Sequence, residues 1–272
     1  MKYPLHAALI AASLTAAACA APLTVTAVPN GTRTQIRERL TPLAHALSHA
    51  LDQPVRFSAP GSIVSFGTLI QQRRPAVIFA GPQILAWATQ YGYQPVLAAR
   101  GTLRFVLVTR SRRVTGKSLA SGQPVCGLPP PNLATLTLFA RYPDLLRQPY
   151  LVMVSSPQAA LQGVASGRCR AASVPIGLLR QAPQGPWYTT FLGQYPNLGF
   201  AVSDGLPAVL RARIAQALVN AARTGALRRL QKANAITGWR VPGPHYFQGH
   251  GYAHLVSGIL GYATPPAQAP AP

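Results

Sequence analysis

Short apolar runs typical of strands alternate along this chain with longer amphipathic runs typical of helices, and this alternation constrains the fold most. A strand at 55–57 precedes a helical run at 63–72, and a buried strand at 76–80 precedes a helix that begins at Gly81 and Pro82. Strands and helices in such alternation predict parallel strands joined by helical crossovers. The sequence therefore predicts an α/β protein.

The alternation runs through the chain twice, which predicts two lobes. A continuous apolar strand at 103–109 leaves the first series, and a strand at 198–202 returns to it before a helix at 207–223. Each lobe should be a mainly parallel sheet flanked by helices, joined to the other by two hinge strands. The expected divisions are 22–104 plus 199–262 for lobe 1, 105–198 for lobe 2, and 264–272 for a disordered proline-rich tail.

Within lobe 1, Thr41 followed by Pro42 predicts the N-cap and first residue of a helix that continues to Leu51.

The first twenty residues predict export. A short positive start at Lys2 precedes an apolar run at 5–18, which is too short to span a bilayer but suits a signal peptide. Small residues at Ala18 and Ala20 predict cleavage after Ala20 and a mature protein that begins at Ala21. Lipid modification of Cys19 is the alternative. Either route predicts a periplasmic protein, free or anchored.

The charge is unusual, because 25 Lys and Arg residues face four acids, for a formal net charge of +21. Such a field favours anionic partners. The basic residues are scattered rather than gathered in one stripe, which argues against nucleic acid. An acidic habitat, in which carboxylates are poor surface charges, is an equal explanation.

Several stretches together carry a family resemblance: VIFAGP at 77–82, LRFVLV at 103–108, QAALQGVASGRCRAA at 158–172, and LGFAV at 198–202 with the Leu206-Pro207 helix start. In order and spacing they resemble the phosphate/phosphonate-type substrate-binding proteins of ABC transporters, which share the type-2 periplasmic binding fold. The resemblance implies two lobes that close on a small ligand and catalyse no reaction. The expected ligand loops differ from the family's pattern, so the identity of the anion stays open.

Ligands of open α/β sheets bind beyond the carboxyl ends of strands, where helix N-termini offer free N–H groups. Four such ends are present, and in the family's geometry two come from each lobe and face each other. The candidate ligand-binding residues are Ser62, Ser65, Gly81, Pro82, Gln83, Asn132, Thr135, Ser155 and Ser156. Each can also be an ordinary helix cap or tight turn with no ligand contact.

Two further features bear on chemistry. Cys126 and Cys169 remain once Cys19 leaves with the signal, and their strands should be neighbours in the second lobe of this fold, which predicts a disulfide in an oxidising compartment. His250 and His254 lie four residues apart and are weak metal candidates, with a solvated loop as the alternative. Neither a cofactor nor a paired set of catalytic acids is expected.

Two functions follow from these patterns. The first is a monomeric periplasmic receptor that captures phosphonate, phosphate, phosphite or a similar oxyanion for an inner-membrane ABC permease. The second is an exported accessory or sensory binding module of the same fold, metal- or redox-linked, without a transporter. The sequence does not separate them.

Overall fold

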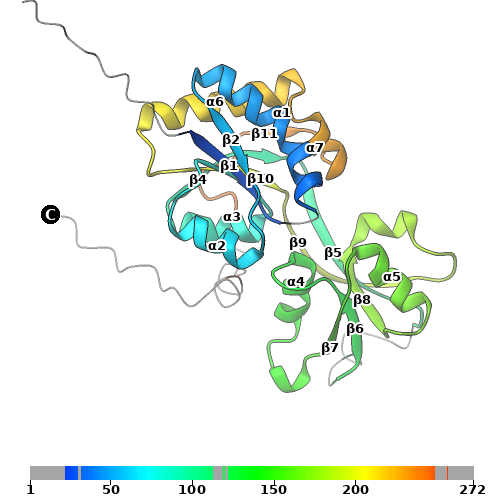
Figure 1. Cartoon of the computed structure of the whole chain (residues 1–272). Helices are drawn as coiled ribbons and strands as arrows, with labels where there is room; N and C mark the ends of the chain where they lie inside the picture. The colour runs from blue at the N-terminus through cyan, green and yellow to red at the C-terminus, as the bar shows by residue number, and fades with distance from the viewer. Residues whose placement is uncertain (1–21, 30–31, 113–118, 120–121, 249–255, 257–272) are drawn as a thin grey trace, which may run out of the picture.

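The structure is a computed structural model that describes residues 22–29, 32–112, 119, 122–248 and 256. The chain forms two lobes, each built around one sheet with helices packed on it (Figure 1). The upper lobe in that view holds both ends of the described chain, and the lower lobe holds the middle. The predicted two-lobe α/β architecture is therefore present.

Lobe 1 contains a six-stranded sheet of order β11-β4-β10-β3-β1-β2. Its elements are β1 (Leu23–Ala27), α1 (Arg33–Leu51), β2 (Val55–Ser58), α2 (Ile63–Gln71), β3 (Val77–Ala80), α3 (Pro82–Thr89), β4 (Tyr93–Ala99), β10 (Gly199–Ser203), α6 (Ala208–Thr224), α7 (Arg228–Ala233) and β11 (Trp239–Arg240).

Lobe 2 contains a five-stranded sheet of order β7-β6-β8-β5-β9. Its elements are β5 (Thr102–Thr109), β6 (Pro124–Gly127), α4 (Leu133–Arg141), the 3-10 turn η1 (Leu145–Arg147), β7 (Tyr150–Met153), α5 (Pro157–Ala165), β8 (Ala171–Pro175), the 3-10 turn η2 (Ile176–Gln181) and β9 (Tyr188–Pro196).

Both sheets are mixed. In lobe 1, β2, β1 and β3 pair in parallel, and β10 is inserted antiparallel between β3 and β4. In lobe 2, β7, β6 and β8 pair in parallel, and β5 is antiparallel to both β8 and β9. The chain enters the second sheet along β5 and returns to the first along β10. Each of these strands runs antiparallel to the neighbouring strands that are joined by helices, so each sheet is only partly parallel.

The two passages between lobes are short and lie side by side. Sheet membership changes between β4 and β5 at 100–101 and between β9 and β10 at 197–198. The Asn197 side-chain amide donates to the Arg100 carbonyl at 3.0 Å, which ties one passage to the other. The strand predicted at 103–109 therefore belongs wholly to the second sheet, whereas the strand predicted at 198–202 belongs to the first. The lobe boundaries for rigid rotation stay a prediction.

The start of α1 differs from the sequence prediction. The helix begins at Arg33 rather than after Thr41, because Thr32 caps it and forms a reciprocal capping box with Gln35. Pro42 consequently lies inside the helix, where it can donate no hydrogen bond. The Thr41 hydroxyl donates to the Arg37 carbonyl one turn back at 2.8 Å.

One hydrophobic cluster crosses from lobe to lobe. Ile84 on α3 and Phe66 on α2 are buried with Leu133 and Leu136 of α4 and with Phe105 of β5. This shared cluster packs the N-terminal end of α4 against lobe 1. The lobes thus meet through apolar contacts next to the loops that precede these helices.

The predicted disulfide is confirmed. Cys126 of β6 and Cys169, just before β8, are joined, with their Cα atoms 5.7 Å apart. The pair is buried beneath α5 in the core of lobe 2. Of the helices in the described residues, none combines the length and apolarity needed to cross a membrane.

Candidate functional site

A cleft of about 320 Å³ opens between the lobes. Lobe 1 supplies the end of β1 and the starts of α2 and α3, and lobe 2 supplies the loop between β6 and α4. The lining residues are Val28, Pro29, Gly61, Ser62, Ile63, Gln83, Ile84, Leu128, Pro129, Pro130, Pro131 and Asn132. The cleft therefore lies at the carboxyl ends of β1, β3 and β6, where a ligand is expected in α/β sheets.

Three helices begin at this cleft, two from lobe 1 and one from lobe 2. Ser62 caps α2 by accepting from the Ser65 amide at 3.1 Å, and the Ser65 hydroxyl oxygen accepts from the Ser62 amide at 3.0 Å. Asn132 caps α4 by accepting from the Ala134 amide at 3.0 Å. Ser62 and Asn132 thus cap their helices at the wall of the cleft.

The third helix, α3, has no side-chain cap. Gly81 is its N-cap and Pro82 its first residue, a position at which a missing N–H costs nothing. A Cβ on Gly81 would lie 2.6 Å from the Gln83 side-chain oxygen, so the glycine leaves room for the Gln83 amide to fold back over the turn.

Backbone donors at the cleft remain available. The first N–H groups of a helix have no intrahelical acceptor. Within the described part of the chain, the amides of Ile63 and Gln83 have no hydrogen-bond partner, and both residues line the cleft. Helix starts with free N–H groups carry partial positive charge and suit an oxyanion.

Gln83 also joins the lobes. The residue is 7% exposed, and its side-chain amide nitrogen donates to the Pro131 carbonyl of lobe 2 at 3.0 Å. Because the nitrogen of this amide donates, the other terminal atom of Gln83 is the Oε1 oxygen. That oxygen is buried and has no hydrogen-bond partner in the described structure. Gln83 is thus a direct polar contact between the walls of the cleft.

The cleft wall is neutral despite the net charge of +21. Among the described residues that line it, none carries a charged side chain. The lining itself offers backbone N–H groups, helix dipoles and neutral polar side chains, and one cation lies beside it: a Cβ on Gly61 would lie 2.6 Å from a terminal nitrogen of Arg33. Such an arrangement can enclose a small anion.

The structure brings together some of the predicted site residues and separates others. Ser62, Gln83 and Asn132 line the cleft, and Ser65, Gly81 and Pro82 belong to the same helix starts. Thr135 is fully buried, and its hydroxyl donates to the Leu128 carbonyl beneath the loop. A ligand role for each of these residues stays a prediction.

Ser155 and Ser156 are placed elsewhere. Ser156 caps α5 by accepting from the Ala159 amide at 3.1 Å, and neither serine lines the cleft. The ordinary capping role accounts for Ser156 as this structure has it.

Sequence reasoning missed the apolar part of the wall. Val28 and Pro29 follow β1, and Leu128 with the prolines at 129–131 follows β6. The position of each segment directly after a strand is a signal for this site, but the sequence prediction named mainly polar ligand-binding residues at helix starts.

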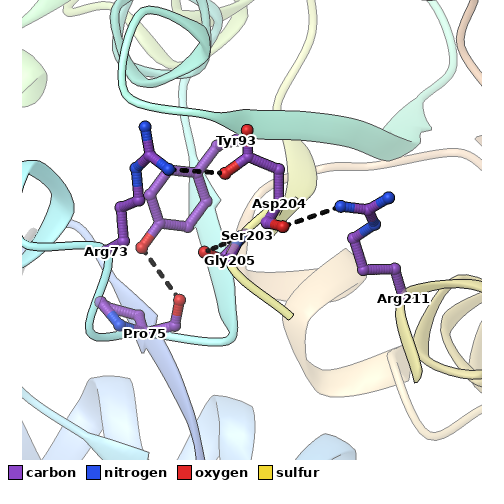
Figure 2. A network of polar contacts seen from close by, with 7 residues as sticks. All are labelled: Arg73, Pro75, Tyr93, Ser203, Asp204, Gly205 and Arg211. Carbon is purple, nitrogen blue, oxygen red and sulfur yellow. Dashed lines mark hydrogen bonds and ion pairs between the residues drawn. The ribbon is translucent and has the colours of Figure 1, made fainter. Parts of the chain in front are cut away.

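A second polar cluster in lobe 1 is structural (Figure 2). The Tyr93 hydroxyl donates to the Pro75 carbonyl at 2.9 Å, and Arg73 forms an ion pair with Asp204 at 3.3 Å. Arg211 donates to the Asp204 backbone carbonyl at 2.8 Å. Since β10 runs antiparallel to β3, this cluster lies at the amino end of β3, away from the cleft.

Burial shapes the chemistry of that cluster. Tyr93 is 1% exposed, and desolvation raises the pKa of its phenol well above its usual value of 10.0. A hydrogen bond to Ser203 and the charge of Arg73 offset only part of this rise. The phenol therefore acts as a neutral hydrogen-bond donor that links β4 to Pro75, just before β3.

The metal candidates His250 and His254 lie outside the described residues. Within the described ranges, no group of three or more His, Cys, Asp or Glu side chains is arranged to hold a metal ion.

The sequence matches one protein family, and many solved structures share the fold of this chain. Residues 25–244 match the family described as "ABC transporter, phosphonate, periplasmic substrate-binding protein". A comparison with curated protein sequences gives no significant match.

Solved structures support the same fold. XAC2383 from Xanthomonas citri, bound to chloride ion, has a TM-score of 0.70 at 14% identity, covering 86% of this chain and 96% of that one. PhnD1 from Prochlorococcus marinus, in complex with methylphosphonate, has a TM-score of 0.64 at 11% identity, with coverages of 83% and 94%. A binding-protein component of an ABC phosphonate transporter from Pseudomonas aeruginosa has a TM-score of 0.59 at 10% identity, covering 83% of each chain.

Proposed function

The chain belongs to the periplasmic substrate-binding protein family of ABC phosphonate transporters, and on this premise we propose that its interlobe cleft captures a small phosphonate, phosphate or phosphite-like oxyanion. A periplasmic location, a small ligand and a permease partner follow from the family. We propose further that the protein acts as a monomer, binds no nucleic acid and leaves its ligand chemically unchanged.

One observation carries the choice of ligand: helix starts from both lobes meet at a cleft whose described walls hold no charged side chain. Free N–H groups at Ile63 and Gln83 would donate to ligand oxygens, each charge-assisted bond contributing roughly 1.5 to 3 kcal/mol before ordering costs. The methylphosphonate in the PhnD1 structure supports this ligand class for the shared fold. The chloride and ATP in the XAC2383 structures mark a broader range of anions to compare.

The test is calorimetric titration with methylphosphonate, phosphite and phosphate, with sulfate, arsenate and acetate as comparators. We expect one ligand per chain and at least one phosphorus oxyanion that binds more tightly than acetate. Recovery of the ligand unchanged after overnight incubation would support a receptor without catalysis.

Asn132→Asp is a sharp variant for this proposal. An aspartate keeps the oxygen that caps α4, so the helix should stay intact. It also places a negative charge at the cleft wall, which should weaken anion binding at least tenfold.

Asn220→Asp is the matched control, because Asn220 is exposed on α6 and accepts from Gln216. It changes the net charge equally and should leave affinity within about twofold. If no anion gives heat or raises the melting temperature at millimolar concentration, the oxyanion function is wrong and the accessory-module alternative leads.

A further inference from the structure

An arginine stands beside the interlobe cleft at the start of α1. Val28 and Pro29 line the cleft after β1, and the chain then enters α1, in which Thr32 is the N-cap and Arg33 the first residue. Figure 1 shows the first turn of α1 at the end of that helix nearer to lobe 2. The backbone of Arg33 is thus close to one segment of the cleft wall.

The Arg33 side chain reaches a second segment of the wall. A Cβ on Gly61, which lines the cleft before the Ser62 cap, would lie 2.6 Å from a terminal nitrogen of Arg33 and 3.8 Å from its Cζ. The nitrogen therefore lies where a side chain at 61 would begin, and glycine leaves that space open. The cation is at the same helix start as the Ile63 amide, which has no hydrogen-bond partner in the described chain.

The Arg33 guanidinium is not engaged by a carboxylate. Neither of the ion pairs found in the described part of the chain involves Arg33, and the residue is exposed. A guanidinium has five N–H donors, which in an exposed, unpaired arginine are bound to water. Ligand oxygens can replace that water without breaking an ion pair of the protein.

Arg33 does not help to stabilise α1. The N-terminus of a helix carries partial positive charge, so a cation in the first turn is unfavourable, and the first turn of α1 has no acidic residue to offset it. Thr32 and Gln35 form the capping box without Arg33. A residue that breaks a local rule of stability beside a cleft indicates a functional role.

We propose that Arg33 binds the oxyanion held in the cleft and favours ligands that carry two negative charges. The proposal rests on the oxyanion function proposed above and adds the charge class of the ligand. Helix N–H groups carry only partial charge, whereas a guanidinium supplies a full charge and paired N–H donors that match phosphonate or phosphate. Because the Coulomb energy is proportional to the ligand charge, a dianion gains twice as much from Arg33 as a monoanion.

The experiment compares two anions of similar shape. In mildly alkaline buffer methylphosphonate carries two negative charges, and dimethylphosphinate, in which a methyl group replaces one oxygen, carries one. Calorimetric titration of the whole mature protein should show tighter binding of methylphosphonate. Arg33→Gln should weaken methylphosphonate binding about tenfold and dimethylphosphinate binding about threefold, the square root of that factor.

Arg37→Gln is the matched control, because it removes the same charge one turn further along α1. Arg37 lines a different hollow, together with Glu38 and Arg228. At physiological ionic strength, which screens distant charges, its affinity for both anions should stay within about twofold of the wild type. Arg33→Lys keeps the charge but loses the paired donors, so its affinity should fall between those of Arg33→Gln and the wild type.

Melting temperatures separate binding from folding. Arg33→Gln should melt no lower than the wild type, because it removes a cation from a helix N-terminus. A clearly lower melting temperature would show that Arg33 has a structural role and would overturn the proposal.

Gly61→Ala tests the geometry independently. The new Cβ would displace the flexible end of the Arg33 side chain, so methylphosphonate affinity should fall in the wild-type background. In the Arg33→Gln background the same change should have little effect, since both substitutions act through one contact. Equal losses in the two backgrounds would overturn the proposal, because Gly61 would then act independently of Arg33.

Failure of this proposal differs from failure of the oxyanion function. If the wild type binds methylphosphonate and Arg33→Gln binds it no more weakly than Arg37→Gln, the role of Arg33 is wrong and the oxyanion function stands. An equal loss for the two anions in Arg33→Gln overturns the charge preference. If neither anion gives heat or raises the melting temperature of the wild type at millimolar concentration, the oxyanion function fails, and the role of Arg33 fails with it.

Discussion

Gly163 on α5 lies against the disulfide, and the space there decides which residue can occupy the position. A Cβ at 163 would lie 2.5 Å from the Cys126 sulfur, which the disulfide prevents from moving aside. Close packing of a helix over a disulfide thus requires glycine at this residue.

Gly163→Ala should lower the free energy of unfolding by about 1 to 3 kcal/mol, because overpacking outweighs the better helix propensity of alanine. Urea denaturation monitored by circular dichroism measures it. Gly177→Ala is the control, since a Cβ there meets nothing within 4 Å. Equal stability of the two variants would contradict the packing argument.

Tyr93 gives a prediction in alkaline solution. Since burial raises the pKa of its phenol, the stability due to the neutral form is complete below about pH 10, the usual tyrosine value, and is lost as pH rises above it. Tyr93→Phe should lower stability at pH 8 by about 1 to 2 kcal/mol, because the Pro75 carbonyl loses its donor.

The same variant should flatten the decline in stability between pH 10 and pH 11, since the group that must ionise is gone. Urea midpoints at both pH values measure this slope. Tyr150→Phe, at a residue that is 65% exposed, should change neither quantity. A slope in Tyr93→Phe as steep as in the wild type would show that Tyr93 does not control alkaline unfolding.

At the scale of elements, the disulfide links β6 to the segment entering β8 across 43 residues of sequence. In the chain-entropy account, closing a loop of that length raises the free energy of the unfolded chain, and so stabilises the folded protein, by about 4 kcal/mol. Cys126→Ala with Cys169→Ala should therefore lower unfolding free energy by about 2 to 4 kcal/mol. Denaturation with and without reductant supplies the comparison, and reductant should leave the double variant unaffected.

The sequence predicted most helix starts well because caps are local. Ser62, Gly81 with Pro82, Asn132 and Ser156 all begin helices as expected. At α1 two local signals competed, and the reciprocal capping box at Thr32 outweighed a proline that the helix accommodates.

Strand β9 was missed because its pattern is weak. Its residues are mostly half-buried or exposed and Gly193 interrupts them, so neither an apolar run nor a clean alternation is present. The strand forms because it pairs with β5, which is distant in the sequence, and the residues of β9 alone do not predict that pairing.

At the candidate site, too, local features could be predicted from the sequence and long-range contacts could not. Caps located the helix starts, but packing between lobes decides which of them meet. Three do, while the start of α5 at Ser156 does not line the cleft. The apolar lining at Val28 and Pro129 likewise depends on how the lobes approach one another.

At the scale of the whole molecule, two short passages beside one another would permit the lobes to rotate as rigid bodies. The shared cluster around Ile84 and Leu136 and the Gln83 donation to Pro131 hold the lobes together in this structure. Opening would expose apolar surface but would also hydrate the unpartnered Gln83 oxygen. These opposing effects predict an equilibrium between closed and open lobes that a single polar contact can shift.

Gln83→Met keeps the side-chain length and removes the donor to Pro131. Losing one such hydrogen bond costs about 1 kcal/mol, which changes the ratio of closed to open molecules about fivefold. The radius of gyration from X-ray scattering without ligand should therefore rise, and oxyanion affinity should fall, with little change in unfolding free energy. Gln90→Met, exposed at the other end of α3, should leave both quantities unchanged. If Gln83→Met scatters like the wild type and binds equally well, the Gln83 contact does not control closure, and the apolar cluster alone holds the lobes together.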